Sequence, residues 1–181
     1  MICVFLANGF EEIEALAFVD ILRRADIDVK TASIYSDYNV TGAHKIQVKS
    51  DLNINELDLN TITGVVLPGG IPGTPNLLDS NDVKKAIEYA INNNLYVGAI
   101  CAAPMILGKL GYLNGKCATS YPDFQKELDG ATVLQTNVVK DGNIITSRGA
   151  GTAHDFAFEF VKAIKNGDLA NSIKSAMQYS I

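Results

Sequence analysis

Short, continuously apolar segments alternate with amphipathic helical patterns along this chain, and that alternation constrains its fold more than any other feature. The segments ICVFLA (2–7), GVVL (64–67) and LYVGAI (95–100) have the composition of strands that are buried on both faces of a sheet. Helical patterns occupy residues 11–25 and 81–94 between them. Strands that alternate with helices predict an α/β protein with a mainly parallel sheet.

The rest of the chain adds further strands, hairpins and helices to this pattern. A glycine between two alternating runs predicts a hairpin over 38–51, and an Asp-Gly pair predicts another over 136–148. We also expect strands at 29–34 and 116–120, and an amphipathic helix over 152–167 that is ended by Gly167 and followed by a last helix. No repeat or linker interrupts the 181 residues, so we expect a single domain over 1–181.

Composition excludes several kinds of partner. The formal net charge is -5 and the chain has no basic run, so neither nucleic acid nor an anionic membrane surface is expected to bind it. No apolar stretch approaches the roughly 18 residues of a membrane helix, and the first residues do not resemble a signal peptide. Three cysteines and no CxxC pair argue against a disulfide framework and for a reducing, cytoplasmic setting. His44 and His154 lie far apart in sequence, and we predict no metal site.

Three predicted strand ends define one place for a functional site. In a parallel α/β sheet, ligands bind beyond the carboxyl ends of the strands. The loop NGFEE (8–12) follows the first strand, PGGIPG (68–73) follows GVVL, and Cys101 follows LYVGAI. Each loop carries glycine or an ionisable residue, so we expect the three loops to form one mouth.

Glu14 occupies an unusual position on its predicted helix. On a wheel of about 100° per residue it lies near the middle of the apolar face, among Ala17, Phe18, Ile21 and Leu22. A carboxylate that is buried there needs either a hydrogen-bond partner or a raised pKa. The alternative is that the first helical turn projects beyond the core and leaves Glu14 in solvent.

Cys101 admits two interpretations from its local sequence. Free cysteine behaves as a small hydrophobe and is common in cores. At a strand-to-helix junction, however, helix amides favour the thiolate, and a tight turn exposes the side chain as a nucleophile elbow does. The backbone N–H groups of PGG (68–70) are then candidates for an oxyanion hole. Cys3 and Cys117 lack such a setting, and we interpret both as structural.

Four segments together resemble the ThiJ/PfpI superfamily, and most closely its DJ-1-like branch. The similarity runs from Ile2 to about Lys174, nearly the whole chain, with the motifs in the same order and at similar spacings. It implies a flavodoxin-like three-layer sandwich and usually a homodimer. The segments that carry the resemblance are LANGFEEIEALAFVDILRRA, VVLPGG, VGAICAAPMIL and ITSRGAGTAHDFA.

The resemblance implies a role for each residue that matches the family pattern. Cys101 matches the oxidisable nucleophile, and Glu14 matches the glutamate whose protonated carboxyl hydrogen-bonds that sulfur. Gly69 and Gly70 match pocket glycines, and we add the neighbouring backbone of Ala102 to the oxyanion-binding group. Arg24 matches an arginine near the dimer interface, close to the site.

Three positions depart from the family pattern. Tyr121 stands in SYPDF where many members of this branch have histidine, and a phenol with a pKa near 10 is a poor proton shuttle at neutral pH. Ala102 replaces the histidine that follows the cysteine in the protease-like branch, so peptidase activity is not expected. His44 falls where a relative has an arginine thought to reach the partner's site, although an exposed loop residue is the simpler interpretation.

Two functions follow from the resemblance. The first is a glyoxalase III or protein deglycase activity on methylglyoxal, glyoxal or their adducts, with Cys101 as the nucleophile, Glu14 as the proton carrier and no cofactor. The second is a non-enzymatic redox sensor or oxidative-stress chaperone that uses the same oxidisable Cys101. A third interpretation is a fold relative whose pocket has no function, since function must be argued from the site rather than the fold.

Overall fold

A seven-stranded sheet forms the centre of the computed structural model, which describes residues 1–179. All neighbouring strands in this sheet are parallel except β10 and β11, which form an antiparallel hairpin. The predicted mainly parallel α/β sheet is therefore confirmed. The strand order is β10 (Val138–Asp141), β11 (Ile144–Ser147), β7 (Tyr96–Ile100), β6 (Gly64–Leu67), β1 (Ile2–Leu6), β2 (Val29–Ser33) and β5 (Leu52–Asn53).

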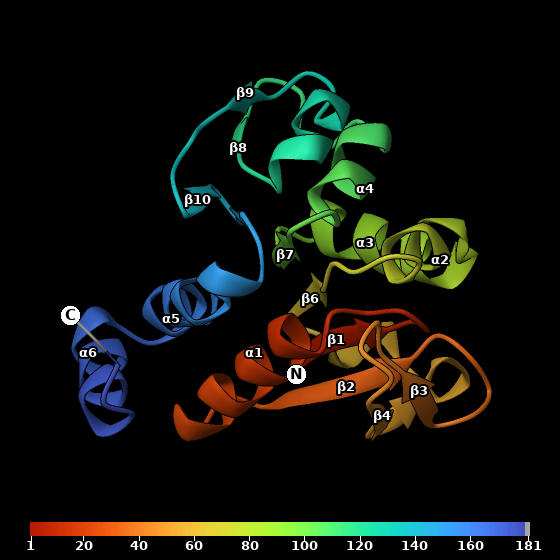
Figure 1. The fold of residues 1–181 in the computed structure, drawn as a ribbon, viewed down its shortest axis with the longest axis horizontal. Coiled ribbons are helices and arrows are strands. Elements are labelled where there is room, and N and C mark those ends of the chain that lie inside the picture. Colours follow the sequence, from red (N-terminus) through yellow and green to blue (C-terminus); the bar gives the residue numbers. More distant parts are fainter. Residues whose placement is uncertain (180–181) are drawn as a thin grey trace.

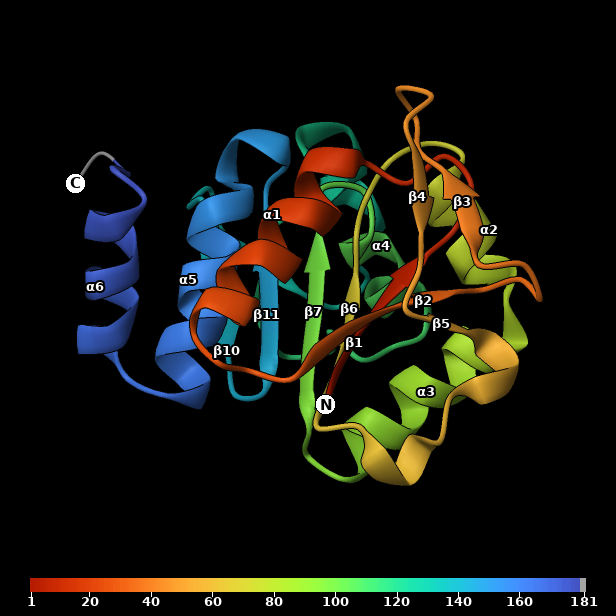
Figure 2. The same cartoon turned by 90° about the horizontal axis from the view of Figure 1, so that it is seen from below.

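Helices cover both faces of the sheet and complete a three-layer sandwich, as Figures 1 and 2 show. Phe18, Phe156 and Phe160 are fully buried between the helices and the sheet on one face, and the rings of Phe18 and Phe160 lie 4.9 Å apart. Val83 and Ile87 are fully buried on the other face. The first face carries α1 (Glu12–Arg24) and α5 (Ala153–Ile164), with α6 (Gly167–Ala176) outside α5, and the second carries α2 (Gly73–Asp79), α3 (Asn81–Asn92) and α4 (Pro104–Lys109).

Two smaller sheets lie apart from the central one. The predicted hairpin over 38–51 is present as β3 (Asn39–Thr41) and β4 (Gln47–Lys49). It stands at the same end of the molecule as the first turn of α1 and the arrowhead of β7 (Figure 2). The strand predicted at 116–120 is shorter, β8 (Cys117–Ala118), and pairs with β9 (Thr132–Val133) outside the central sheet.

Two predicted helix boundaries are wrong. The helix over 152–167 ends earlier, at Ile164, and Gly167 instead begins α6, because the Asn166 side chain caps that helix by accepting a hydrogen bond from Leu169 N at 2.9 Å. The short apolar run at residues 102–110 predicts a helix directly after Cys101, but α4 begins only at Pro104, where proline fits the first helical turn. Residues 101–103 form a turn rather than a helix start.

The helices are short, and α1 is the longest with 13 residues. Within residues 1–179, none has both the length and the apolar composition that a membrane crossing requires.

Candidate active site

Residues that follow the carboxyl ends of β1, β7 and β11, together with Tyr121 and Pro122 after β8, line one cavity of about 500 Å³. Two of the three loops that were expected to form one mouth contribute to it, as the parallel sheet predicts, but no residue of the PGGIPG loop (68–73) after β6 is in the lining. Cys101 and Glu14 both line the cavity. The full lining is Glu11, Glu14, Cys101, Tyr121, Pro122, Arg148, Gly149, Ala150, Gly151 and Thr152.

Cys101 is held in a backbone conformation that few non-glycine residues adopt, with φ at +62°. Two hydrogen bonds hold it there: its N–H donates to Ser147 O, and its carbonyl accepts from Tyr121 N, both at 2.9 Å. Such strain persists only where the surrounding structure enforces it, and it is frequent at functional sites. The turn is the sharp strand-to-helix turn that presents a side chain as a nucleophile elbow does.

Glu14 is 1% exposed, so it is buried in the apolar face of α1 rather than solvated. Its Oε2 accepts a hydrogen bond from the backbone N–H of Gly69 at 2.7 Å. Its Oε1 is buried without a hydrogen-bond partner among the described residues. Burial raises the pKa of Glu14 to about 7, although hydrogen bonds from Gly69 and Cys101 oppose the shift.

Of the two interpretations that the sequence leaves open for Cys101, the low-pKa thiolate is not favoured while Glu14 is charged. Burial, the Glu14 charge and the hydrogen bond to Glu14 together raise the pKa of Cys101 to about 12, and the N–H of Ala102 lowers it only in part. The helix whose amides were expected to favour the thiolate begins three residues later, at Pro104, and spans only six residues. The sulfur and the carboxyl form a coupled pair in which protonated Glu14 removes the charge that opposes the thiolate.

Gly69 lies between Glu14 and Cys101 in space, and close packing explains why this residue is glycine. A Cβ on Gly69 would lie 2.6 Å from Cys101 Cβ and 2.8 Å from Glu14 Oε2, so only glycine fits. The Gly69 N–H already donates to Glu14 and is not free for the predicted oxyanion hole. Gly70 has φ +96° and lies outside the cavity lining, whereas the buried Ala102 presents its N–H to the sulfur.

Tyr121 lines the cavity and is 46% exposed. Its backbone N–H donates to Cys101 O, and the residue directly precedes the 3-10 helix Pro122–Glu127. Within residues 1–179 no histidine lines this cavity, so the substitution of the family histidine by tyrosine is not compensated by another imidazole.

Arg24 is not part of this site. It lies in the last turn of α1, ten residues beyond Glu14, which corresponds to about 15 Å along the helix. It is exposed, and its Nε donates to Asp20 Oδ2 at 2.6 Å. Arg24 therefore does not line the cavity of its own chain, and its place near a dimer interface stays a prediction.

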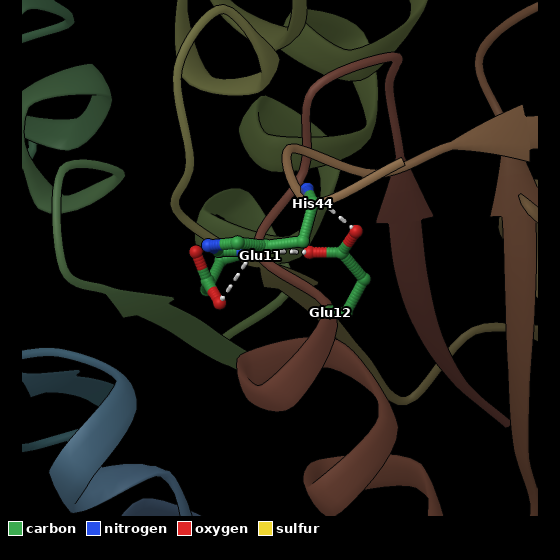
Figure 3. A group of neighbouring side chains, drawn as sticks. All are labelled: Glu11, Glu12 and His44. Atoms are coloured by element: carbon green, nitrogen blue, oxygen red, sulfur yellow. Dashed lines mark hydrogen bonds and ion pairs between the residues drawn. The ribbon is translucent and has the colours of Figure 1, made fainter. Parts of the chain in front are cut away.

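His44 lies beside the site rather than in it. Its Nδ1 is 2.9 Å from Glu12 Oε2 and 3.5 Å from Glu11 Oε1 (Figure 3). The hydrogen bond to Glu12, followed by the charges of Glu11 and Glu12, raises the pKa of His44. Burial alone would raise the pKa of Glu12, but hydrogen bonds from the His44 ring and from backbone N–H groups, including those of His44 and Ile46, lower it.

The Glu11, Glu12 and His44 side chains bring three metal-ligating atoms within 4.8 Å of one another. The prediction that the histidines form no such cluster is thus too simple, because the 38–51 hairpin folds back onto the first turn of α1. The Glu12 carboxylate is already saturated, since Oε1 accepts from His44 N at 2.8 Å and Oε2 contacts the imidazole. Hydrogen bonding within the chain therefore accounts for the cluster.

Sequence reasoning missed one wall of the cavity. Residues 148–152, which follow β11, provide five of the ten lining positions. The available signal was the segment RGAGT immediately after a predicted strand, a fourth strand end of the same kind as the other three. A Cβ on Gly149 would lie 3.9 Å from Cys101 Sγ, so this wall borders the sulfur.

A second and larger groove, of about 670 Å³, lies between β10 and helices α5 and α6. Its lining includes Asp155, Glu159 and Lys162 but no cysteine. The smaller cavity is the better candidate because it combines a strained nucleophile with a buried carboxyl of raised pKa.

Comparisons with known proteins place these observations in a family. Residues 1–163 match the DJ-1/PfpI family. Protein DJ-1 homolog A of Arabidopsis thaliana is 33% identical over 95% of this chain, which spans only 45% of that relative's length. Deglycase PfpI of Pyrococcus furiosus is 34% identical over 88% of this chain and 96% of its own. The structure of oxidized Toxoplasma gondii DJ-1 superposes with a TM-score of 0.95 at 29% identity, covering 99% of this chain and 98% of that one.

Proposed function

The chain belongs to the DJ-1/PfpI family, and we propose that it is a cofactor-independent enzyme that acts on 2-oxoaldehydes such as methylglyoxal and glyoxal, or on their adducts with proteins. The observation that carries this proposal is the pair formed by Cys101 and Glu14 in one cavity. A strained cysteine supplies the nucleophile, and a buried carboxyl with a pKa of about 7 can both accept and donate a proton near neutral pH. The name of the Pyrococcus relative, a deglycase, points to the same chemistry.

The first step forms a covalent hemithioacetal. The thiol proton passes to the Glu14 carboxylate while the sulfur of Cys101 adds to the aldehyde carbon of R–CO–CHO. Glu14 then gives that proton to the aldehyde oxygen. The Ala102 N–H, which lowers the pKa of the Cys101 sulfur, is the donor we propose for the developing oxyanion.

The second step moves hydrogen between the two substrate carbons. Glu14 removes the proton from the former aldehyde carbon, which gives an enediolate, and returns a proton to the former ketone carbon. The hydroxyl proton shifts to the second oxygen, which leaves a thioester on Cys101. Water then hydrolyses the thioester to a 2-hydroxy acid and the free thiol, so one carbon is oxidised, its neighbour is reduced, and no external oxidant is needed.

The raised pKa of Glu14 supports it, rather than the second lining carboxylate Glu11, as the carrier of these protons. No imidazole lines the cavity within the described residues, and a tyrosine hydroxyl is a weak acid at neutral pH. Tyr121 can still donate a hydrogen bond to a substrate oxygen. We therefore expect slower turnover than an enzyme of this kind with a second proton carrier would show.

A redox sensor or stress-protective role is the second candidate. The observation that favours it is that Cys101 is free and lines an open cavity beside Glu14, whose protonated form can donate a hydrogen bond to a sulfinate. The Toxoplasma relative has been described in an oxidized form. The pKa of about 12 weighs against this role while Glu14 is ionised, because the thiolate is the form that peroxide oxidises.

We also propose that the protein works as a homodimer. The outer face of α1 exposes Ile13 and Leu16, and the hairpin loop exposes Ile46, whose N–H contacts Glu12 on the same helix. Exposed apolar side chains on adjoining elements are typical of an interface between protein chains. This face adjoins the cavity, because Glu11 and Glu14, which line the cavity, lie in the same helical turn as the exposed Ile13.

Lactate formation from methylglyoxal tests the enzymatic proposal directly. The wild type, Cys101→Ser and Glu14→Gln are compared, with Cys117→Ser as the matched cysteine control. We expect the Cys101 variant to be inactive, the Glu14 variant to lose about 10²- to 10⁴-fold, and the control to retain activity. Equal rates in the wild type and the Cys101 variant would reject the enzyme. Quantitative conversion of Cys101 to sulfinic acid by peroxide would then support the sensor.

A further inference from the structure

Arg148 differs from the other two arginines of this chain. Arg23 lies 2.8 Å from Asp51, and Arg24 lies 2.6 Å from Asp20. Within residues 1–179, the Arg148 side chain has neither a carboxylate within 4.0 Å nor a hydrogen-bond acceptor. Its backbone N–H is used structurally and donates to Asn137 O at 3.1 Å. The structure thus fixes the main chain of Arg148 and leaves its guanidinium without a partner.

Arg148, whose guanidinium is unpartnered within residues 1–179, is one of the residues that line the cavity of the nucleophile. Arg148 is partly buried and lines the same 500 Å³ space as Cys101 and Glu14. The next residue, Gly149, borders the sulfur, since a Cβ there would lie 3.9 Å from Sγ. A cavity of this volume is within the range of small-molecule sites.

The acidic groups around the cavity do not pair with Arg148. Glu11 lines the cavity and its charge helps to raise the pKa of Glu14 and of Cys101, but its Oε1 lies 3.5 Å from His44 Nδ1, and within residues 1–179 it forms no ion pair with Arg148. Glu14 is held by Gly69, and burial raises its pKa to about 7, so its negative charge is progressively lost as pH falls below neutral. Burial raises the pKa of Cys101 to about 12, so the thiol adds no charge there.

A second buried atom also lacks a partner in this cavity. Glu14 Oε1 belongs to a side chain that is 1% exposed, and it has no hydrogen-bond partner within the described residues. Buried polar atoms are usually satisfied, and guanidinium groups bind carboxylate and phosphate with paired hydrogen bonds. One ligand with an oxygen at its reactive end and an anion at its other end would satisfy both groups.

We propose that Arg148 binds an anionic group of the substrate, and that the substrate class is a 2-oxoaldehyde bearing a carboxylate or a phosphate. This inference rests on the proposed function and specifies its substrate. The reaction remains R–CO–CHO + H₂O → R–CH(OH)–COO⁻ + H⁺, with Cys101 forming and losing the bond to carbon as before. Arg148 holds the far end of R and does not exchange protons.

Matched substrates test this assignment. The carboxylate arm compares 4,5-dioxopentanoate with neutral 2-oxopentanal, which has the same five-carbon chain, and the phosphate arm uses 3-phosphooxy-2-oxopropanal. The measured quantity is the ratio of kcat/KM for the anionic substrate to kcat/KM for the neutral one. We expect this ratio to fall about tenfold to hundredfold in Arg148→Met, as for loss of a charged hydrogen bond, and to recover in part in Arg148→Lys.

Lys85→Met is the matched control, because it removes one positive charge from α3, where Lys85 pairs only with the exposed Asp82. Its ratio should equal that of the wild type. A preference for the carboxylate arm alone or the phosphate arm alone would identify the anion. If the wild type turns over 2-oxopentanal as well as it turns over both anionic substrates, the inference about Arg148 is overturned while the proposed function stands.

Alkylation of Cys101 gives a readout that does not depend on turnover. Iodoacetate and iodoacetamide attach groups of similar size to the thiolate, but only iodoacetate is an anion. The iodoacetate-to-iodoacetamide rate ratio at Cys101, measured by mass spectrometry of the peptide, should fall about tenfold in Arg148→Met and stay unchanged in Lys85→Met. An equal ratio in all three proteins would overturn the role of Arg148, even if no substrate were turned over.

Discussion

Glu14 Oε2 accepts the backbone N–H of Gly69 at 2.7 Å, while the Oε1 atom of the same carboxyl has no partner in the described chain. The helix that follows β1 is thereby tied to the loop that follows β6. One oxygen is fixed, and the other is left for the reacting groups. The proton that this carboxyl holds near pH 7 is therefore available to groups in the candidate cavity, which Glu14 lines.

The raised pKa of Glu14 predicts how stability depends on pH. The folded protein holds this proton up to about pH 7, whereas an unfolded glutamate releases it near 4.5. The folded state therefore binds more protons between these values, and the stabilisation present below pH 4.5 is lost as pH rises to 7. The difference amounts to about 3 kcal/mol of unfolding free energy. Urea unfolding at pH 4.5 and 7 should show this loss relative to Glu14→Gln.

The variant provides its own control, because every other titrating group is retained. The wild-type stability minus that of Glu14→Gln should decline across this interval. A difference that stays flat would mean that Glu14 is ionised in the folded state throughout.

Gly69→Ala tests the close approach between the loop and the catalytic pair. The added methyl would lie 2.6 Å from Cys101 Cβ and 2.8 Å from Glu14 Oε2, so one of them must move. We expect a loss of about 1–3 kcal/mol in stability and a fall of about a hundredfold in kcat/KM for methylglyoxal. Gly167→Ala is the matched control, because an added Cβ there meets nothing within 4 Å. Full activity in the Gly69 variant would show that the pair tolerates displacement.

The parts of the site that sequence reasoning predicted share a simple physical origin. Glu14 was identified because helical periodicity places it on an apolar face, and Cys101 because a strand end in a parallel sheet has a known location. The pKa of Cys101 was not predictable, since it depends on burial and on a carboxylate supplied by a distant segment. Arg24 lies about 15 Å along the helix from Glu14, so its implied place near the site depends on a dimer interface that a single chain does not contain. The wall at 148–152 has no hydrophobic periodicity, and its one sequence signal was its place directly after a predicted strand.

The contact between His44 and Glu12 predicts a measurable titration. The imidazole lies 2.9 Å from Glu12 Oε2, and this hydrogen bond raises the pKa of His44 above its ordinary value of 6.5. The ring stays protonated to higher pH, and its ion pair with Glu12 is lost only as pH rises through the raised pKa of His44 in the folded protein. Glu12→Gln should move the NMR titration midpoint of His44 back toward 6.5. Glu88→Gln removes an exposed carboxylate from α3 and should leave it unchanged, so an equal shift in both variants would contradict the contact.

The exposed face of α1 predicts how the dimer can be separated without disturbing the fold. Leu16 is 38% exposed and Ile13 is 53% exposed, so neither side chain supports the core of the single chain. A charge placed among them would be buried without a partner in the dimer, which is strongly unfavourable, but would stay solvated in the monomer. We therefore expect Leu16→Glu to shift the mass measured by light scattering from two chains to one, with an unchanged circular dichroism spectrum. Asn92→Glu adds the same charge at an exposed position of α3 and should keep the wild-type mass. If Leu16→Glu kept that mass too, the chains would have to associate through another surface, and the apolar face of α1 would need a different explanation.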